Sequence, residues 1–441
     1  MKQAKIIFVL TISLVSILST STSALDINRR VLSNGLNVLH VKRHNLPIVM
    51  LTLLIKASPL NEPSDKAGLA SLTAGLLTEG TKNRTASMIS EEIEFIGASL
   101  SASTGSDYTT ISLSVLKKDI EKGFELLSDV LLNPTFPEEE IQREKELIEG
   151  SLRQNEEMPS FIAEKAFKKE LYGEHSYGRL IQGSPETLKN IQRTDIVKFY
   201  LDYFVPNNAI LSVAGDLTDE ELDSLVKRFL GEWKNADVPL HKHALPKPPA
   251  KKMLKIDKDL TQANIIVGGL GVKRDNPDYY ILSVMNYILG GGGFSSRLMQ
   301  SVRDEMGLAY DIHSSFTPGK DSGAFQVVVQ TKNESANEVI SEILKEIKRI
   351  REENVTPAEL EDAKAFLIGS FAGKIDTMRK ISDFLAVVEF YGLGMDYIEK
   401  YPLYISSVTQ EDILRAAKKY LDIENLIIVV VADEAKAKIM P

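Results

Sequence analysis

The alternation of apolar and polar positions predicts a protein that mixes strands and helices. Residues 29–55 alternate and then become continuously apolar, with Asn34 and Gly35 between two strand-like segments, which is the signal of a two-residue hairpin. Alternation returns over 97–116 and predicts a pair of strands. Leucines and isoleucines at three- and four-residue spacing predict helices over 68–79, 87–96, 117–133 and 137–157. Strands and helices are therefore interleaved, but they do not alternate strictly.

This pattern recurs in the second half of the chain. A strand that leads through one helix into a second occupies 111–151 and again 325–370. Lys145 and Gly150 precede Lys364 and Gly369 by the same interval of 219 residues. A repeat of this length indicates duplicated domains rather than a short-period solenoid. The alternative is two unrelated α+β domains whose helices begin with similar residues.

The chain is too long for one ordinary core, since single domains usually have ~100 to 200 residues. Residues 235–252 are rich in proline and lysine and have too few apolar side chains to form a core element. We therefore predict an α+β fold of two domains, 25–234 and 253–441, joined by a linker over 235–252.

Residues 1–24 have the features of a secretory signal peptide. Lys2 and Lys5 precede the apolar run 6–18, and small residues precede Leu25. The run is too short for a membrane span, which needs ~20 residues, although an uncleaved anchor is the alternative. No later stretch is long and apolar enough to cross a membrane. We therefore expect an exported protein, most simply one of a bacterial periplasm.

Composition and charge exclude several kinds of site and partner. The chain has no cysteine, so it has neither disulfides nor thiolate metal ligands, and a zinc site would need histidine and carboxylate. Its formal net charge is −9, and loss of the two signal lysines makes it −11. An acidic chain of this kind is not expected to have nucleic acid or anionic lipid as its main partner.

The most informative stretch is GLASLTAGLLTEGTKNR, residues 68–84. On a helix its leucines share one side, and the other side carries only small residues, Ser71, Ala74, Gly75 and Thr78. Its pattern G-L-A, then L-x-x-G-T and a basic residue, resembles the helix of the insulinase and pitrilysin family of zinc peptidases, which carry H-x-x-E-H there. The resemblance implies that the two zinc-binding histidines and the catalytic glutamate are replaced by Ser71, Ala74 and Gly75.

The resemblance extends well beyond this helix. It implies a further glutamate ligand on the helix before QNEEMP, where the nearby residues are Gly150 and Ser151. Zinc hydrolysis needs three protein donors and an activated water, which these residues do not supply. Similar stretches at 171–217 and 290–315 extend the resemblance over nearly all of 27–435. It implies two homologous domains, each an antiparallel-rich mixed sheet backed by helices, that face each other as a shell.

Residues that could take part in chemistry remain in the second half. Arg303 and Tyr310 match an arginine and a tyrosine that, in the family, reach across the shell toward the zinc site of the opposite domain. A guanidinium can hold substrate carbonyls or a carboxylate, and a phenol can donate to a developing oxyanion. Just before them, Gly290, Gly291, Gly292 and Gly293 either admit a close substrate backbone or form a flexible connector.

We assign no metal to any histidine of the chain. His40 and His44 lie in a strand-like segment, where their spacing does not converge on one ion. His175 resembles a family histidine in a surface turn and is interpreted as structural. The remaining histidines are His241 and His243, both in the linker, and His313.

The leading hypothesis is a catalytically incomplete subunit of a periplasmic heterodimeric zinc peptidase. Its partner would carry H-x-x-E-H and the zinc, and this chain, with no cofactor of its own, would supply Arg303 and Tyr310. The resemblance also suggests that an edge strand over 99–104 pairs with extended peptide, although Ser101 replaces a frequent family asparagine. The alternative is a stand-alone peptide-binding or assembly protein, which would need no such partner. A scaffold built on an old peptidase fold would give Arg303 and Tyr310 no purpose.

Overall fold

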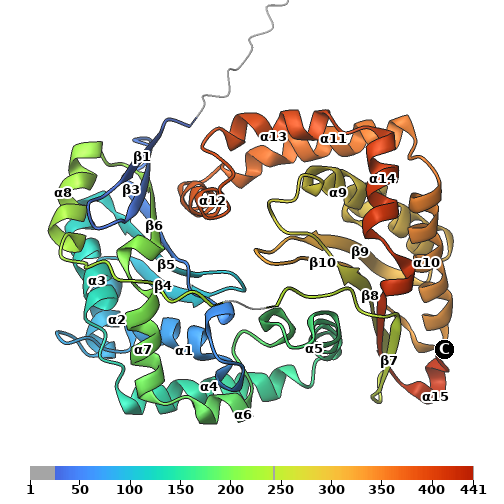
Figure 1. Cartoon of the computed structure of the whole chain (residues 1–441), viewed down its shortest axis with the longest axis horizontal. Helices are drawn as coiled ribbons and strands as arrows, with labels where there is room; N and C mark the ends of the chain where they lie inside the picture. The colour runs from blue at the N-terminus through green and yellow to red at the C-terminus, as the bar shows by residue number, and fades with distance from the viewer. Residues whose placement is uncertain (1–24, 242–243, 441) are drawn as a thin grey trace, which may run out of the picture.

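A computed structural model of the protein describes residues 25–241 and 244–440. The predicted export signal and His243 lie outside this part. Figure 1 shows two sheets that face each other across the molecule, with most helices on their outer sides. None of the described helices is long and apolar enough to span a bilayer.

The first half contains a six-stranded mixed sheet in the order β1-β2-β6-β3-β5-β4. Only β2 and β6 pair in parallel. Its strands are β1 (Ile27–Val31), β2 (Asn37–Lys42), β3 (Ile48–Ile55), β4 (Ser99–Thr104), β5 (Thr109–Leu116) and β6 (Ala209–Gly215). Its helices are α1 (Leu69–Gly75), α2 (Ala86–Phe95), α3 (Ile120–Leu132), α4 (Glu138–Asn155), α5 (Pro159–Tyr172), α6 (Pro185–Asn190), α7 (Arg193–Tyr203) and α8 (Asp219–Leu230).

The second half contains a five-stranded sheet in the order β7-β11-β8-β10-β9. Its strands are β7 (Lys252–Asp257), β8 (Gln262–Leu270), β9 (Ala309–Thr317), β10 (Ala324–Lys332) and β11 (Ile427–Ala432). Its helices are α9 (Tyr279–Asn286), α10 (Ala336–Glu352), α11 (Pro357–Phe371), α12 (Met378–Phe390), α13 (Tyr397–Ser406), α14 (Gln410–Tyr420) and α15 (Glu434–Ala437), with wider π-type turns at 287–291 and 299–305.

The two sheets have the same topology. In each, one parallel pair is followed by three antiparallel neighbours, so that β2, β6, β3, β5 and β4 correspond to β7, β11, β8, β10 and β9. Strand β1 is an additional edge strand of the first sheet. The repeat read from the sequence is therefore a repeat of whole domains.

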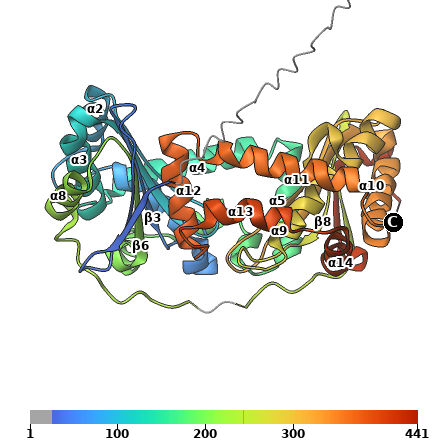
Figure 2. The ribbon, with the colours of Figure 1, turned by 90° about the horizontal axis from the view of Figure 1, so that it is seen from above.

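Two local predictions need correction. The opening hairpin forms, but Asn34 and Gly35 lie in a longer connection over 32–36, closed by a hydrogen bond from the Leu32 amide to the Leu36 carbonyl at 2.9 Å. Residues 231–241 and 244–251 form no helix or strand and run along the outside of the molecule (Figure 2). Strand β7 already begins at Lys252, within the predicted linker range.

Each half covers one face of its sheet with its own helices and the other face with a helix from the opposite half. Helix α12 packs on β6 and β3, where its Ile381 and Leu385 meet Leu39 and Leu54 in one buried cluster. Helix α5 packs on β11 and β8 in the same way, with Phe167 fully buried among apolar strand residues. The continuously apolar sequences of the central strands explain this arrangement, because both of their faces are apolar and need cover.

A buried carboxylate joins the two halves at their meeting point. Asp107, in the turn between β4 and β5, accepts hydrogen bonds from the phenol of Tyr177 and from the phenol of Tyr391 at 2.7 Å. It also accepts one from the backbone amide of Lys320 at 2.9 Å. These donors come from the turn after α5, the end of α12 and the turn between β9 and β10, so one side chain connects four segments of the chain.

Candidate functional site

Helix α1, which carries the replaced zinc positions, is held firmly at its first turn. Leu69, Leu72 and Leu76 are buried on its core side, as the sequence predicts. At its N-terminus the buried carboxylate of Glu62 accepts hydrogen bonds from the amides of Gly68 at 3.1 Å and Ala70 at 2.9 Å. These bonds satisfy amides that a helix leaves free at its start. Burial raises the pKa of Glu62 to about 7, although the helix amides act to lower it.

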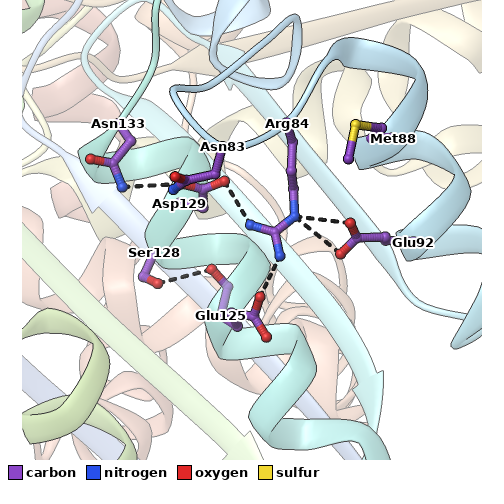
Figure 3. Close-up of a pocket in the computed structure, with 8 residues that line it drawn as sticks. All are labelled: Asn83, Arg84, Met88, Glu92, Glu125, Ser128, Asp129 and Asn133. Atoms are coloured by element: carbon purple, nitrogen blue, oxygen red, sulfur yellow. Dashed lines mark hydrogen bonds and ion pairs between the residues drawn. The ribbon is translucent and has the colours of Figure 1, made fainter.

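The Gly-Thr pair at the end of the motif anchors α1 to α3. The Thr81 hydroxyl donates to Asp129 at 2.7 Å and accepts from the amides of Asn83 and Arg84. Arg84 in turn binds Asp129, Glu92 and Glu125, as Figure 3 shows. The three carboxylates line a pocket of about 440 Å³, but the guanidinium already lies among them. We therefore assign this cluster a structural role.

The small-residue face of α1 lies beside a single remaining carboxylate. A Cβ added to Gly75 would lie 3.5 Å from Oε1 of Glu144 on α4. Burial, with the negative charges of Glu79 and Glu140, raises the pKa of Glu144. The family resemblance points to Gly150 and Ser151 on this helix, but not to Glu144. Its position one turn before Ile148, on the partly buried side of α4, was the available signal.

This site does not fit a zinc ion. Ser71 and Gly75 offer no imidazole, and Ala74 is 0% exposed, so its position points into the protein. Within residues 25–241 and 244–440, no three histidine, aspartate or glutamate side chains come together in a way that could hold a metal. One carboxylate and one hydroxyl are fewer donors than the three that a hydrolytic zinc requires.

In the second half, Arg303 and Tyr310 do lie together. The Arg303 guanidinium carbon is 4.8 Å from the centre of the Tyr310 ring and 4.7 Å from that of Phe294. Tyr310 is 84% exposed and Phe294 is 67% exposed. No carboxylate of the described chain forms an ion pair with Arg303. The arginine is thus positioned by two aromatic rings and keeps its hydrogen-bond donors available. The sequence analysis did not identify Phe294.

Arg297, six residues earlier, has a contrasting environment. It is buried and binds both oxygens of Glu359 on α11, at 2.6 and 2.9 Å. Burial acts to raise the pKa of Glu359, but the guanidinium and the Thr356 amide hold it at about 2. Arg297 therefore fixes the turn before the Arg303 segment to α11, whereas Arg303 is free to contact another molecule.

The glycine run before these residues is packed against the chain itself. Gly290 is buried, and a Cβ there would lie 2.6 Å from Oγ of Ser314 on β9. Added Cβ atoms at Gly291 and Gly292 would meet Asn286 and Tyr287. Gly293 differs, since it has φ +58 and open space around it. Three of the four glycines thus have a packing reason for lacking a side chain.

The histidines have separate partners. Nδ1 of His40 lies 2.7 Å from Asp219 and Nδ1 of His44 lies 2.6 Å from Asp216, so the two rings do not converge. His313 pairs with Asp311 on β9, and the ring of His241 lies 6.2 Å from that of Tyr203.

The expectation of a surface turn at His175 is wrong. The residue is buried, its Nδ1 accepts from the Tyr177 amide, and its Nε2 lies 3.4 Å from Asp321 of the other half. The turn after α5 is buried because it lies at the junction of the two halves, which the sequence could not indicate.

Strand β4 is an edge of the first sheet and lies next to α1. Ser101 is exposed on it, and the Thr104 hydroxyl donates to the Ala70 carbonyl at 3.2 Å. Its outer backbone groups are available for strand addition.

Comparison with known proteins identifies the family to which this chain belongs. Residues 37–184 match the sequence profile of the insulinase family (peptidase family M16), and residues 190–367 match that of the peptidase M16 inactive domain. The chain belongs to the insulinase family. With its zinc positions replaced, it is an inactive homologue of the M16 peptidases, consistent with a non-catalytic subunit.

Individual members of the family support this assignment. The chain is 26% identical over 438 residues to a protein of Helicobacter pylori named a non-peptidase homolog, and the match covers 98% of this chain and 99% of that protein. It is 29% identical over 347 residues to an uncharacterized zinc protease of Rickettsia bellii, covering 77% and 81%. A solved peptidase M16 inactive domain from Pseudomonas fluorescens superposes with a TM-score of 0.87 at 27% identity, covering 92% and 98%.

Proposed function

We propose that this chain is the non-catalytic subunit of an exported, periplasmic, heterodimeric zinc metallopeptidase. A partner of the same family carries H-x-x-E-H and the zinc. This chain contributes Arg303 and Tyr310, which bind the peptide and stabilise the transition state.

One observation carries the proposal. Arg303 is stacked between Phe294 and Tyr310, has no ion pair within the described residues, and lies beside one of the most exposed aromatic rings of the chain. A pair that served only the fold would resemble Arg297 and Glu359, in which a buried arginine is paired with a carboxylate. Donors aimed at a developing negative charge are typically each worth about 100- to 1000-fold in rate.

The decisive experiment needs the partner. A pull-down of the tagged mature chain from its native periplasm, with co-eluting proteins identified by mass spectrometry, should recover a near-stoichiometric chain with H-x-x-E-H. In the reconstituted pair, Arg303→Ala and Tyr310→Phe should each lower peptide turnover about 100-fold or more while co-elution is unchanged. Arg153→Ala, an exposed arginine on α4, and Tyr404→Phe serve as matched controls. Unchanged turnover in both variants would remove the in-trans role.

The second candidate function is a stand-alone peptide-binding or assembly protein. The observation that favours it is the open edge of β4, which can bind extended peptide without hydrolysis. Recovery of the bait without any H-x-x-E-H chain would support this candidate over the subunit.

A further inference from the structure

A continuous groove runs between α5 and the second sheet. Helix α5 covers β11 and β8 but leaves β10 and the edge strand β9 open on that face. Two cavities, of about 590 and 390 Å³, lie in the uncovered part, and both are lined by Phe161 and Glu164 of α5. They therefore adjoin, and together we call them the α5 groove.

The two ends of the α5 groove differ in chemistry. The larger cavity is lined by Met158 and Phe161 on one side and by Tyr310 on the other, with Val328 on its floor. Met158 is 45% exposed at its edge, so its side chain is available to a bound molecule. This end suits a large apolar side chain.

The smaller cavity has a positively charged wall. It is lined by Lys165, Lys168 and Arg179. The lysines already pair with Glu156 and Glu164.

Arg179 has no such pairing. Its Nη2 donates to the Ser176 hydroxyl at 3.0 Å, and its Nη1 makes no hydrogen bond within the described residues, whereas its Nε is shielded from solvent. Its charge acts on Glu62, which lowers the pKa of that carboxyl, but the two groups do not form an ion pair. A carboxylate from another molecule would complete the hydrogen bonding of this guanidinium.

Side-chain amides line both ends of the α5 groove. Gln326 and Gln330 on β10 and Asn264 on β8 line the cavities, and their side chains make no hydrogen bond within the described residues. Amides repeated along a strand match the alternating donors and acceptors of an extended peptide. From Tyr310 to Thr317 the groove follows β9 for roughly 23 Å, about seven residues of extended chain.

We propose that the α5 groove binds an extended peptide with a large apolar side chain at the Tyr310 end and a carboxylate, about six residues away, at the Arg179 end. This inference rests on the proposed function and specifies its substrate class. Because Tyr310 lines the same groove, a peptide held there would extend toward the Arg303 and Tyr310 pair. The carboxylate is either the C-terminus of the peptide or an acidic side chain.

The test measures binding to the full mature chain alone, by fluorescence anisotropy of labelled octapeptides. All have phenylalanine at the second position and otherwise alanine and threonine. One ends in a free carboxylate, one in an amide, and one in an amidated glutamate. We expect the amidated peptide without glutamate to bind roughly 10- to 100-fold more weakly than at least one of the others, and that partner identifies the carboxylate source.

Variants assign the effect to the groove. Arg179→Gln should abolish the preference for a carboxylate, and the matched change Arg153→Gln should not. Met158→Asp should weaken all peptides, whereas Met88→Asp, at a methionine of equal exposure (44%) on α2, should not. Thermal unfolding reports whether each variant is folded.

Several results would overturn the inference: equal affinity for all three peptides, no binding of any, or an unchanged preference in folded Arg179→Gln. Should Arg179→Gln not fold, the peptide comparison on the wild-type chain and the Met158 pair decide. Turnover by the assembled enzyme is measured separately. A failure of the groove hypothesis in the binding test can therefore be distinguished from a failure of the proposed role of Arg303 in turnover.

Discussion

The two halves of the molecule share a topology and differ in what their helices present. In the first half, α1 presents Ser71 and Gly75 beside Glu144, with Ala74 buried. In the second half, the segment before β9 presents Arg303 beside the rings of Phe294 and Tyr310. Packing residues are present in both halves, whereas an arginine that stacks on exposed aromatic rings is found in the second.

This difference shows that the fold does not depend on the metal site. Helix α1 is fixed by the carboxylate of Glu62 and the hydroxyl of Thr81, and neither would need a zinc ion nearby. Replacement of the zinc positions by small residues therefore leaves the helix in place. The residues that hold α1 in place are therefore different from those at its replaced zinc positions.

The largest effect on stability is expected from truncating the side chains by which α5 and α12 pack on the sheet of the opposite half. Phe167→Ala on α5 and Leu385→Ala on α12 delete fully buried side chains that face the opposite half's sheet. We expect losses of about 3–5 and 2–5 kcal/mol in the free energy of unfolding, measured by urea denaturation. Leu201→Ala, at an exposed position of α7, should change it by less than about 0.5 kcal/mol. Equal, small effects at all three positions would contradict the interlocked arrangement.

A smaller effect is expected at the carboxylate that joins the halves. In Asp107→Asn an amide group replaces an oxygen that accepts hydrogen bonds, and the backbone amide of Lys320 cannot reverse its direction. The expected loss is about 2–3 kcal/mol in unfolding free energy. Asp311→Asn, at an exposed aspartate of β9, is the control. If both variants unfold like the wild type, Asp107 does not hold the halves together.

The free energy of unfolding should depend on pH through Glu62, the carboxyl at the start of α1. The pKa of Glu62 is raised from 4.5 to about 7, so the folded protein holds this proton more tightly than the unfolded chain. The resulting stabilisation is full below pH 4.5 and is lost as the pH rises through 7. Between pH 5 and 8 the loss is about 2 kcal/mol.

Glu62→Gln tests this dependence because glutamine does not titrate. The difference in unfolding free energy between wild type and Glu62→Gln should change by about 2 kcal/mol from pH 5 to pH 8. A constant difference over this range would show that the carboxyl is ionised throughout. Glu146→Gln, on the exposed side of α4, controls for a change of one charge.

The smallest change in stability is expected where zinc donors are put back. Ser71→His with Gly75→His places two imidazoles one helical turn apart. A side chain at position 75 fits there without a clash, since its Cβ would lie 3.5 Å from Oε1 of Glu144. We expect the double variant to bind one Zn²⁺ per chain, measured by equilibrium dialysis, and to lose this ion when Glu144→Gln is added. Binding unaffected by Glu144→Gln would show that the carboxylate does not face the restored pair.

The sequence predicts the elements well because their signals are local. The apolar periods of β3, α3 and α4 and the repeat at α11 follow from positions that are buried in the structure. The five-residue connection after β1 was missed because Asn-Gly is also compatible with longer turns. Which sheet α5 or α12 covers was not predictable, since an amphipathic helix carries no information about which half its partner belongs to.

The candidate site was predicted only in part for the same reason. Arg297 and Arg303 look alike in the sequence, and only packing separates the arginine that binds Glu359 from the one that stacks on Phe294. Glu62, Glu144 and Asp107 are three among many acidic residues, and only the fold buries Glu62 and Asp107 and half-buries Glu144. The replaced zinc positions, in contrast, were readable because the surrounding motif fixes their order along the chain.

Because α5 and α12 each pack on the sheet of the opposite half, the two halves depend on each other for folding. Either half produced separately would leave a sheet face bare and a lone helix without its hydrophobic support, so neither is a free-standing unit. A protease cut at the exposed residues 239–241 should instead leave two fragments that stay bound to each other through the packing of α5 and α12. The packing of these two helices would then hold the halves together without a covalent connection between them.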